Sequence, residues 1–551
     1  MDYLTSVQNL LKTTAKQPDK VFLNQPIDRQ WHTFTWREVE HQARCIAAGL
    51  IAQGYKPQSR IGILSKNCAQ WFIADLAITM AGMISVPIYA TAGKKTISYI
   101  ISHAELKAIF VGKLDSLIEA ESAIDDNVLR ISFPYPTISA NTTWSKWLEQ
   151  YAPLATLHQP DLNDISTIVY TSGTTGQPKG VEITHKNLAS AAASTAIVLQ
   201  AKASDRCMSY LPLAHITERS VIEHVCFYIG CEVFFVESLD TFIDDVQHAE
   251  PTLFLSVPRL WSKFQAQILA KIPQKKLTFL LSLPVVGRIV AYKIRKALGL
   301  HKADRFGSGT APISIAVLSW FHSIGINIGE GWGMSETSGM SCGNTPFIKN
   351  NLGTIGRALS CVEMSLSDKN EILIRGDAVF KQYYLNEEAT ANAFVDGWFR
   401  TGDSGEIGHD GSFKIVGRLK EQFKTSKGKY IVPVPIECSL YANLNIEQVC
   451  VMGSGLKQPI ALVILSDNCT RQDAELTQGL EDTLQQINDA LESHQKLDYL
   501  LVCSEPWTID NGFLTPTMKL KRNEIENKFQ ALVESELSGK VLWEETISNG
   551  K

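Results

Sequence analysis

The sequence has little of what marks a membrane-spanning, disulfide-bonded or nucleic-acid-binding protein. One uncharged stretch, Leu76 to Gly93, has nearly the length of a membrane span, but Gly82 and Pro87 divide it into a predicted helix, turn and strand. The eleven cysteines include no CxxC pair, which favours reduced, mostly buried thiols over disulfides or a metal site. The formal charge of −5 provides no general attraction to nucleic acid, so no nucleic-acid partner is expected.

The first twenty residues also lack the basic start and apolar core of a secretory signal, which predicts a cytoplasmic protein. What is present is an ordinary globular composition, with 45% hydrophobic and 20% charged residues. A chain of 551 residues exceeds the size at which a single core stops growing, so we expect two or more domains.

Helical and strand patterns alternate through the first part of the chain. Thr35 and Glu38 have the spacing of a capping box, and the apolar residues after them recur with a helical period. This alternation predicts an α/β domain with a largely parallel sheet, and residues 112–163, where the patterns are weaker, are expected at its periphery. The strands are predicted at 60–65, 83–89 and 107–111, and the helices at 68–80 and 96–103.

From Ile355 onward the pattern changes to short alternating strands separated by Gly and Asp. It predicts a small antiparallel or barrel-like subdomain over about 355–417. The segment beyond it has the size of a separate α+β domain, with strands near 448–452 and 459–465 and a helix near 473–493. We therefore predict a large N-terminal α/β domain, residues 1–417, followed by a smaller α+β domain.

The stretch Tyr170–Gly180, YTSGTTGQPKG, has the composition of a phosphate-binding loop. The apolar run from Asp164 to Tyr170 predicts a buried strand that leads into it. Its glycines allow an anion to approach backbone N–H groups, and its hydroxyls and one lysine add donors. It is not a Walker A loop, because Lys179 is followed by glycine; the alternative is a flexible surface loop. The candidate phosphate-binding residues are Thr171, Ser172, Gly173, Thr174, Thr175, Gly176 and Lys179.

Residue for residue, this loop resembles the phosphate loop of the acyl-adenylate-forming superfamily, which includes acyl- and aryl-CoA synthetases, luciferases and peptide-synthetase adenylation domains. The resemblance extends from about Asp2 to about Ala531. Four segments are similar to long-chain fatty acyl-CoA synthetases: LPLAHITER (211–219), VPRLW (257–261), residues 423–437 and TPTMKLKR (515–522). Other superfamily-like motifs, in chain order, are GSGTAP (307–312), GWGMSET (331–337), VDGWFRTGDSGE (395–406) and GRLKE (417–421).

The resemblance implies an ATP site with Mg²⁺ as cofactor. Glu336 would hold the Mg²⁺ together with the Thr171 hydroxyl, and hard oxygen ligands of this kind suit that ion. Thr337 would hydrogen-bond the α-phosphate. The adenine-binding residues would be Gly309, Thr310, Ala311, Gly331 and Trp332. The superfamily usually has Tyr at the position of Trp332, so the chain departs there; an indole can still stack on adenine.

The same resemblance assigns residues to the ribose, the hinge and the two chemical steps. Asp403 and Arg418 would bind the ribose, and Lys519 would drive adenylation. His215 stands where the superfamily has an aromatic or histidine gate beside the reacting carboxyl, although a lone histidine is often structural. The hinge, residues 418–421, would let the C-terminal domain, 422–551, move and bring the loop at Gly428 to the site; its Glu421 replaces the more usual Asp.

The function so implied is ATP-dependent activation of a long-chain fatty acid through acyl-AMP to acyl-CoA, with fatty acid and coenzyme A as substrates. One alternative is a fatty acyl-AMP ligase that loads a carrier protein. An amino-acid adenylation enzyme usually has an Asp for the amine in its pocket, and the sequence does not locate one. A non-catalytic nucleotide-binding sensor would be expected to lack Lys519 or Glu336, and both are present.

One segment leaves two interpretations open. Leu277–Gly287 is apolar and lies between Lys275-Lys276 and a basic run from Arg288 to Lys302. Residues of about 275–302 could form an amphipathic surface helix that touches anionic lipid, which would make the protein peripheral on the inner face of a membrane. The other interpretation is a solvated cationic helix. The sequence leaves a homodimer open as well.

Overall fold

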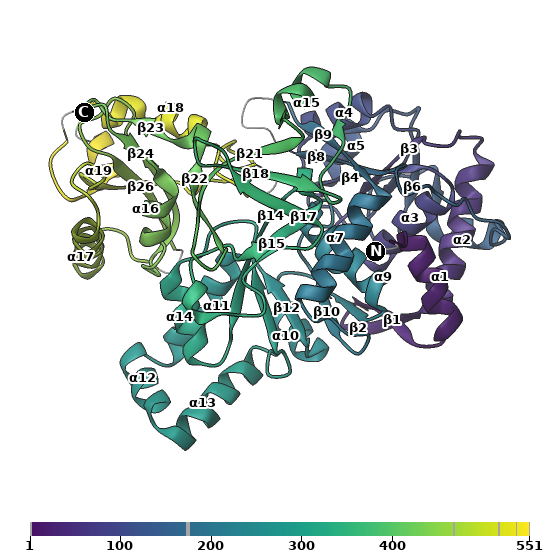
Figure 1. Ribbon diagram of the computed structural model, residues 1–551, viewed down its shortest axis with the longest axis horizontal. Helices are drawn as coiled ribbons and strands as arrows, with labels where there is room; N and C mark the ends of the chain where they lie inside the picture. Colours follow the sequence, from purple (N-terminus) through teal and green to yellow (C-terminus); the bar gives the residue numbers. More distant parts are fainter. Residues whose placement is uncertain (1–2, 172–176, 467–468, 516–517, 536, 550–551) are drawn as a thin grey trace.

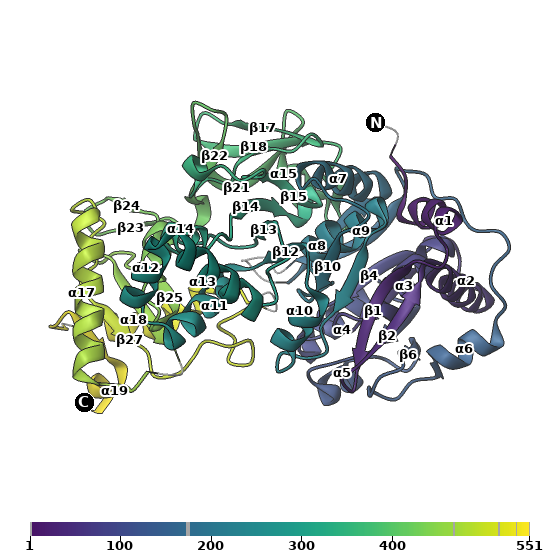
Figure 2. The ribbon, with the colours of Figure 1, turned by 90° about the horizontal axis from the view of Figure 1, so that it is seen from below.

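The computed structural model describes residues 3–171, 177–466, 469–515, 518–535 and 537–549; Ser172–Gly176 of the predicted phosphate loop therefore lie outside the described residues. Two large sheets and one antiparallel sheet form the N-terminal domain, and the smaller C-terminal domain has a sheet of its own (Figure 1). Seen from below, the C-terminal domain lies at one end of the molecule and helices α1 and α2 at the other (Figure 2).

Eight of the described strands form the first large sheet, which is parallel except where β9 pairs with β8 and β19. Its central strands β3, β4 and β5 are almost wholly buried, which explains their near-continuous apolar sequences. The three strands predicted between residues 60 and 111 are confirmed to within two residues. In order, the sheet contains β19 (Gln382–Tyr383), β9 (Lys179–Thr184), β8 (Ile165–Thr171), β4 (Ile84–Ile88), β3 (Arg60–Leu64), β5 (Ala108–Val111), β6 (Leu129–Ser132) and β7 (Thr142–Thr143).

The second large sheet contains nine described strands and is parallel in its middle, from β1 to β14. Its edges are antiparallel, at β1–β2 and at β14–β15–β16. In order, the strands are β16 (Arg357–Ala358), β15 (Gly339–Gly343), β14 (Ile328–Met334), β13 (Arg305–Ser308), β12 (Leu253–Ser256), β10 (Arg206–Ser209), β11 (Glu232–Phe235), β1 (Val21–Ile27) and β2 (Gln30–Thr35).

Two helices lie between the large sheets and pack against both. Helix α3 (Ala69–Met80) is buried at every position and contacts β1 of one sheet and β3 and β4 of the other. Helix α7 (His185–Val198) contacts β9 and β15 in the same way. A helix that is buried on every side needs such a position, because it has no face to offer to water. The predicted division of Leu76–Gly93 into helix, turn and strand is thereby confirmed.

The remaining helices pack around these sheets and on one another, and α12 and α13 project from the domain (Figure 1). The capping box predicted at Thr35 and Glu38 is present at the start of α2. The helices are α1 (Ser6–Lys16), α2 (Trp36–Ala52), α4 (Lys94–His103), α5 (Leu117–Ala123), α6 (Trp144–Gln150), α8 (Ile216–Glu218), the π-helix η1 (Arg219–His224), α9 (Val225–Ile229), α10 (Phe242–Ala249), α11 (Pro258–Lys271), α12 (Gln274–Ser282), α13 (Pro284–Ala297) and α14 (Ile315–Ser323).

The region after Ile355 forms an antiparallel sheet, as its alternating pattern predicted. Two 3₁₀ turns, η2 (Ser335–Thr337) and η3 (Lys349–Asn351), precede it, and helix α15 (Glu387–Ala393) lies within it. The sheet packs through Ile374 and Phe399 on the apolar side of β9 and α7. Its strands are β17 (Val362–Leu366), β18 (Glu371–Gly376), β20 (Phe394–Val395), β21 (Trp398–Ile407) and β22 (Phe413–Arg418).

The C-terminal domain is a mixed α/β unit. It begins after the 3₁₀ turn η4 (Leu419–Glu421); the hinge and the domain boundaries around it stay predictions. Among the described residues, no helix is both long and apolar enough to cross a bilayer. The strands are β23 (Phe423–Lys424), β24 (Tyr430–Ile431), β25 (Ile446–Met452), β26 (Ile460–Leu465), β27 (Leu500–Val502) and β28 (Val541–Trp543), and the helices are α16 (Pro433–Leu440), α17 (Ala474–Ala490), α18 (Arg522–Val533) and α19 (Glu544–Asn549).

Candidate functional site

The two predicted adenine segments lie side by side. Strand β13 ends at Ser308, and the backbone N–H of Gly309 donates to the Ser256 carbonyl at 3.2 Å. A side chain at Gly309 would come within 3.2 Å of the Gly331 carbonyl, so glycine allows the two backbones to approach. Thr310 follows with a φ of +68°, the turn that leads to Ala311. The structure therefore brings the GSGTAP and GWGMSET motifs together.

The predicted phosphate loop joins two antiparallel strands. Thr171 at the end of β8 faces Lys179 at the start of β9, and the Thr171 hydroxyl donates to the Lys179 carbonyl at 3.5 Å. Strand β9 has no counterpart in the sequence analysis, because its six residues follow the glycine-rich loop without a turn signal. The pairing fixes both ends of the loop, although Ser172, Gly173, Thr174, Thr175 and Gly176 lie outside the described residues.

Tyr383 links this loop to the predicted Mg²⁺ ligand. Its hydroxyl donates to Glu336 Oε1 at 2.9 Å, and the Lys179 ammonium lies over its ring, 5.1 Å from the centroid. Burial and the Glu336 carboxylate raise the pKa of the Tyr383 hydroxyl, which therefore stays protonated as a donor. Sequence reasoning missed Tyr383, because β19 contains only two residues and gives no strand pattern.

Glu336 and Thr337 stand on the short turn η2. Glu336 is almost completely buried, and its backbone carbonyl accepts from the Phe380 N–H at 2.8 Å. The Thr337 hydroxyl accepts from the Met334 N–H at 3.0 Å and from the Ser341 hydroxyl at 2.7 Å. Thr337 therefore stabilises the turn that presents Glu336, and its predicted contact with the α-phosphate stays a prediction.

The predicted ribose-binding pair forms an ion pair between neighbouring strands. Asp403 on β21 faces Arg418 on β22, and Arg418 Nε lies 2.9 Å from Asp403 Oδ1. The indole N–H of Trp332 donates to the other carboxylate oxygen, Oδ2, at 3.1 Å. Burial raises the pKa of Asp403, while the Arg418 cation opposes that rise. Trp332, where the superfamily usually has Tyr, thus orients the carboxylate through its N–H.

Lys519 reaches this site from the C-terminal domain. Thr515 holds its backbone: the Lys519 N–H donates to the Thr515 hydroxyl at 3.1 Å, and the Lys519 carbonyl accepts from the Thr515 N–H at 2.8 Å. Its ammonium is close enough to Glu336, Asp403 and Arg418 for their charges to act on it. Loss of hydration among the surrounding protein atoms lowers the pKa of Lys519, although its side chain keeps contact with solvent.

His215 is a neutral group that lies within reach of the Lys519 charge. It precedes α8, and its Nδ1 accepts from the Thr217 N–H at 3.2 Å. Burial, with a smaller effect from the Lys519 cation, lowers the pKa of His215 to about 3. Because Nδ1 is an acceptor, the ring proton of the neutral imidazole is on Nε2. His215 can therefore donate to an oxygen atom, but at neutral pH it does not add a positive charge.

A buried charge network is centred on Arg219, four residues after His215, and sequence reasoning missed it. Arg219 is completely buried and bonds Asp75 at 2.6 Å, the Thr167 hydroxyl at 2.6 Å and Glu223 at 3.4 Å. It therefore ties η1 to α3 and to β8, the strand that leads into the phosphate loop. Asp75, Glu223 and His224 also have the spacing of metal ligands, but the guanidinium already supplies the cation there.

The hinge region is held to the C-terminal domain by one arginine. Arg522 lies 3.2 Å from Glu421 and forms a bidentate pair with Glu437, at 2.6 and 2.5 Å. Gly428 is not brought to the other predicted residues. It occupies the exposed tip of the β23–β24 hairpin with a φ of +75°. A Cβ atom added at Gly428 would have no other atom within 4 Å.

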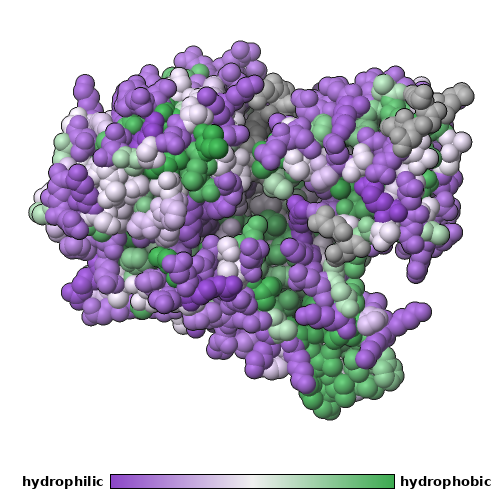
Figure 3. All heavy atoms as spheres, turned by 180° about the vertical axis from the view of Figure 1, so that it is seen from behind, coloured by the Kyte–Doolittle hydropathy of each residue, from purple (hydrophilic) through white to green (hydrophobic). Residues whose placement is uncertain are grey.

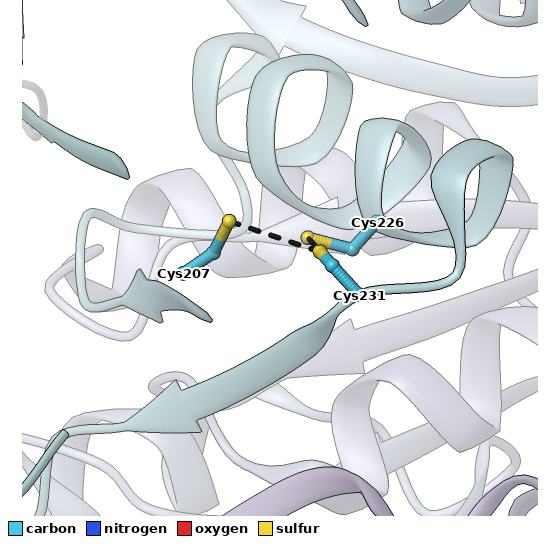
Figure 4. Close-up of side chains that lie close together, drawn as sticks. All are labelled: Cys207, Cys226 and Cys231. Carbon is cyan, nitrogen blue, oxygen red and sulfur yellow. Dashed lines mark hydrogen bonds between the residues drawn. The ribbon is translucent and has the colours of Figure 1, made fainter. Parts of the chain in front are cut away.

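Three cysteines gather in the core of the N-terminal domain, apart from the residues predicted to bind ATP. Cys207 on β10, Cys226 on α9 and Cys231 before β11 point toward one another (Figure 4). The sulfur of Cys231 lies 3.1 Å from that of Cys226 and 3.8 Å from that of Cys207. All three are buried, and burial raises the pKa of Cys226 and Cys231. Their spacing in sequence gave no signal for this cluster.

Comparisons with known proteins agree over nearly the whole chain. Residues 10–384 match the family model described as AMP-binding enzyme, and residues 420–538 match the AMP-binding enzyme C-terminal domain. The chain is 31% identical over 591 residues to long-chain-fatty-acid–CoA ligase 5 of Rattus norvegicus, which covers 93% of this chain and 84% of the relative. It is 30% identical over 575 residues to long-chain-fatty-acid–CoA ligase FadD15 of Mycobacterium bovis, with 94% of each covered.

Solved structures share the fold at lower sequence identity. The adenylation domain of a carboxylate reductase from Mycobacterium chelonae has a TM-score of 0.81 at 20% identity, covering 96% of this chain and 91% of that one. The anthranilate CoA ligase AuaEII, in complex with anthranoyl-AMP, has a TM-score of 0.79 at 19% identity, covering 97% and 98%. One family model spans most of the chain and a second takes up its C-terminal part. The chain belongs to the AMP-binding enzyme family.

Proposed function

We propose that this chain activates a long-chain fatty acid with ATP and transfers the acyl group to coenzyme A. Membership of the family makes it an adenylate-forming enzyme; the finer assignment concerns the acid and the acceptor. The observation that carries the proposal is the position of Lys519, which brings a cation from the C-terminal domain to the carboxylates of Glu336 and Asp403. The relatives named long-chain-fatty-acid–CoA ligases support the choice of acid.

In the first step, the fatty acid carboxylate attacks the α-phosphorus of ATP and displaces pyrophosphate. The Lys519 ammonium is placed to neutralise negative charge that develops between the carboxylate and the α-phosphate. His215 stays neutral and can orient a carboxylate oxygen through its Nε2–H. Asp403, fixed by Arg418 and Trp332, keeps further acceptor capacity for the ribose hydroxyls.

The residues near Glu336 fit a Mg²⁺ ion. Tyr383 uses one acceptor position of the Glu336 carboxylate, and a carboxylate offers about four such positions. Glu336 and the Thr171 hydroxyl would hold the ion, and a hard cation there neutralises phosphate oxygens when bound. The Lys179 ammonium over Tyr383 adds positive charge on the phosphate-loop side.

The second step needs a different arrangement of the C-terminal domain. Gly428 is exposed on the β23–β24 hairpin, whereas Lys519 faces the N-terminal site. We infer that the C-terminal domain rotates about the hinge at Lys420-Glu421, so that Lys519 leaves and the hairpin with Gly428 enters. The thiol of coenzyme A then attacks the acyl carbonyl and releases AMP. Arg522, which bonds Glu421 and Glu437, would carry the end of the hinge with the domain.

Product analysis tests the acid and the acceptor together. Purified protein is given ATP, Mg²⁺ and single fatty acids from short to very long, each with and without coenzyme A, and the products are identified by mass spectrometry. We expect thioester only with coenzyme A and only from long acids, since each buried CH₂ adds about 0.8 kcal/mol of binding. Acyl-AMP that accumulates despite coenzyme A would instead favour a ligase that loads a carrier protein. No product from any acid would contradict the proposal.

A further inference from the structure

A helical hairpin projects from the N-terminal domain. Helices α12 and α13 pack on each other and extend from the lower side of the molecule (Figure 1). Leu277 and Ile294 are buried in the core at the base, and Trp320 on α14 donates its indole N–H to Gln274 at 2.8 Å. At the turn, a side chain on Gly287 would come within 2.6 Å of the Leu281 carbonyl, so the two helices approach there as only glycine permits. Contacts with the core and close packing at the turn therefore hold the hairpin in a defined structure.

Its end exposes large apolar side chains. Phe279, Val285 and Ile289 are 64%, 71% and 52% exposed, and Leu283, Val286 and Tyr292 are exposed beside them. We call these six residues the hairpin tip. In the space-filling view from behind, apolar residues gather over the end of the projecting hairpin (Figure 3). Six large apolar side chains exposed together on one projecting element are unusual for a protein surface that meets only water.

The surroundings of the hairpin tip are strongly basic. Residues 251–303 contain ten Lys or Arg residues and no Asp or Glu, so the rest of the chain has a net charge of −15. Within the described residues, Arg259 and Lys302 of this stretch pair with Glu447 and Glu250. The exposed hairpin cations Lys275, Lys276, Arg288, Lys293 and Lys296 form no ion pair within the part of the chain that is described.

A groove lies beside the hairpin tip, between α13 and the end of α14. Its volume is about 330 Å³, and its lining includes Arg288, Arg295 and His322. Arg295 also donates to the Ile324 carbonyl at 2.7 Å, which fixes one wall. The groove therefore combines positive charge with a position directly next to exposed apolar side chains. A lipid phosphate with its acyl chains is complementary to both, because the phosphate is negatively charged and the chains are apolar.

We propose that the hairpin docks on an anionic membrane surface, with its tip among the acyl chains and its cations on the lipid phosphates. The charge favours this occupant over a second copy of the chain, because two hairpins packed on each other would bring ten positive charges together. The hairpin lies at the interface and does not span it, since fourteen residues of α13 extend about 21 Å and a hydrocarbon core measures about 30 Å. The proposal is independent of the acid that the enzyme activates.

Vesicle co-sedimentation of the full chain tests the proposal. The vesicles contain phosphatidylcholine alone or with about 30% phosphatidylglycerol. The apolar variant is Phe279→Ser/Val285→Ser/Ile289→Ser, and its matched control is Ile118→Ser/Leu239→Ser, at side chains 84% and 92% exposed elsewhere. The charge variant is Lys275→Gln/Lys276→Gln/Lys293→Gln, matched by Lys12→Gln/Lys16→Gln/Lys146→Gln at exposed lysines of other elements.

We expect the wild type and both controls to bind the anionic vesicles at least tenfold more tightly than the neutral ones. The apolar variant should lose at least tenfold in affinity, and the charge variant about fivefold per lysine, with a further loss in 0.5 M NaCl. Thermal unfolding at the wild-type temperature would show that each variant folds. Equal binding by the wild type and the folded apolar variant would overturn the proposal. A wild-type dimer that the apolar variant converts to monomer, without any vesicle binding, would overturn it in favour of self-association.

Discussion

At the scale of single residues, the site depends on one lysine that the C-terminal domain brings to the N-terminal site. The Lys519 cation acts on Glu336, Asp403, Arg418 and His215, four residues from segments far apart in the sequence. Its pKa is lowered chiefly by loss of hydration. An ammonium group that is poorly hydrated interacts more strongly with charge that develops on a substrate than one in open water does.

We predict that Lys519→Ala abolishes adenylation but leaves ATP binding intact. Removing the cation should slow ATP–pyrophosphate exchange by at least about a hundredfold, since it stabilises only the transition state. Exchange rates and ATP titration by calorimetry measure the two properties separately. Lys521→Ala, at an exposed lysine two residues further on, serves as the matched control. Undiminished exchange in Lys519→Ala would remove Lys519 from the mechanism.

We predict that the same lysine sets the alkaline limit of adenylation. The lowered pKa means that the cation is lost, as pH rises, below the usual lysine value of about 10.4. The rate of ATP–pyrophosphate exchange should fall accordingly on the alkaline side. Lys519→Arg keeps its charge at that pH, so its residual activity should show no such fall. An unchanged alkaline limb in this variant would assign the limb to another group.

We predict that Tyr383→Phe weakens Mg²⁺ binding more than it slows catalysis at saturating Mg²⁺. The variant loses the hydroxyl that donates to Glu336 at 2.9 Å, and losing such an outer contact typically costs tenfold or more in metal affinity. Half-saturating Mg²⁺ in the exchange assay should rise by about tenfold, while the rate at saturating Mg²⁺ changes little. Tyr384→Phe, at the neighbouring residue, is the control. A lower rate at saturation with unchanged Mg²⁺ dependence would contradict a positioning role.

The sequence predicted the site residues that lie inside the motifs, but it did not predict the residues that hold them in place. Glu336, Asp403 and Lys519 stand inside recognisable segments. Tyr383 and the Arg219–Asp75 pair depend on contacts between distant segments, which no local pattern records. The use of the Trp332 N–H toward Asp403 was equally out of reach, because it needs the geometry of two sheets.

At the scale of elements, local signals account for the helix starts. The Thr35 hydroxyl accepts from the Glu38 N–H at 3.3 Å, and the Glu38 carboxylate accepts from the Thr35 N–H at 2.7 Å. These reciprocal bonds satisfy two donors at the start of α2, as the sequence predicted. By contrast, β9 and β19 were missed, since tertiary pairing next to the phosphate loop, and not propensity, makes them strands.

We predict that Thr35→Ala lowers the free energy of unfolding by about 1 kcal/mol. The substitution leaves the Glu38 N–H without its side-chain acceptor at the first turn of α2. Thr35→Ser keeps the oxygen atom and should retain most of the stability. Chemical denaturation of both variants measures the difference. Equal losses in the two variants would show that the methyl group, and not the cap, is responsible.

At the scale of the whole molecule, an ion pair between described residues connects the two domains at the VPRLW segment. Arg259 on α11 bonds Glu447 on β25 in the arrangement in which Lys519 faces the N-terminal site. Both side chains keep contact with solvent, so the pair adds little to overall stability. It can still bias the choice between two domain arrangements that differ by little free energy.

We predict that Glu447→Arg slows adenylation about three- to fivefold, because it places like charges across the domain interface. Thioester formation from supplied acyl-AMP should be unaffected, since that step uses the other arrangement. The double variant Arg259→Glu/Glu447→Arg restores the pair with reversed sign and should recover adenylation. The two half-reactions, measured separately by stopped flow, distinguish these cases. Equal slowing of both steps would show damage to the fold instead of a shifted domain equilibrium.

The order of strands in the second large sheet matters while the protein is being made. Leu23 on β1 faces Val233 on β11, so one of the first strands to leave the ribosome pairs with one that is synthesised much later. At about 5–20 residues per second, that wait lasts about 10–40 s. Asp75 likewise cannot be buried with its counter-charge until Arg219 has been translated. The nascent chain therefore carries an unpaired strand edge through this interval, and assistance from chaperones would matter most there.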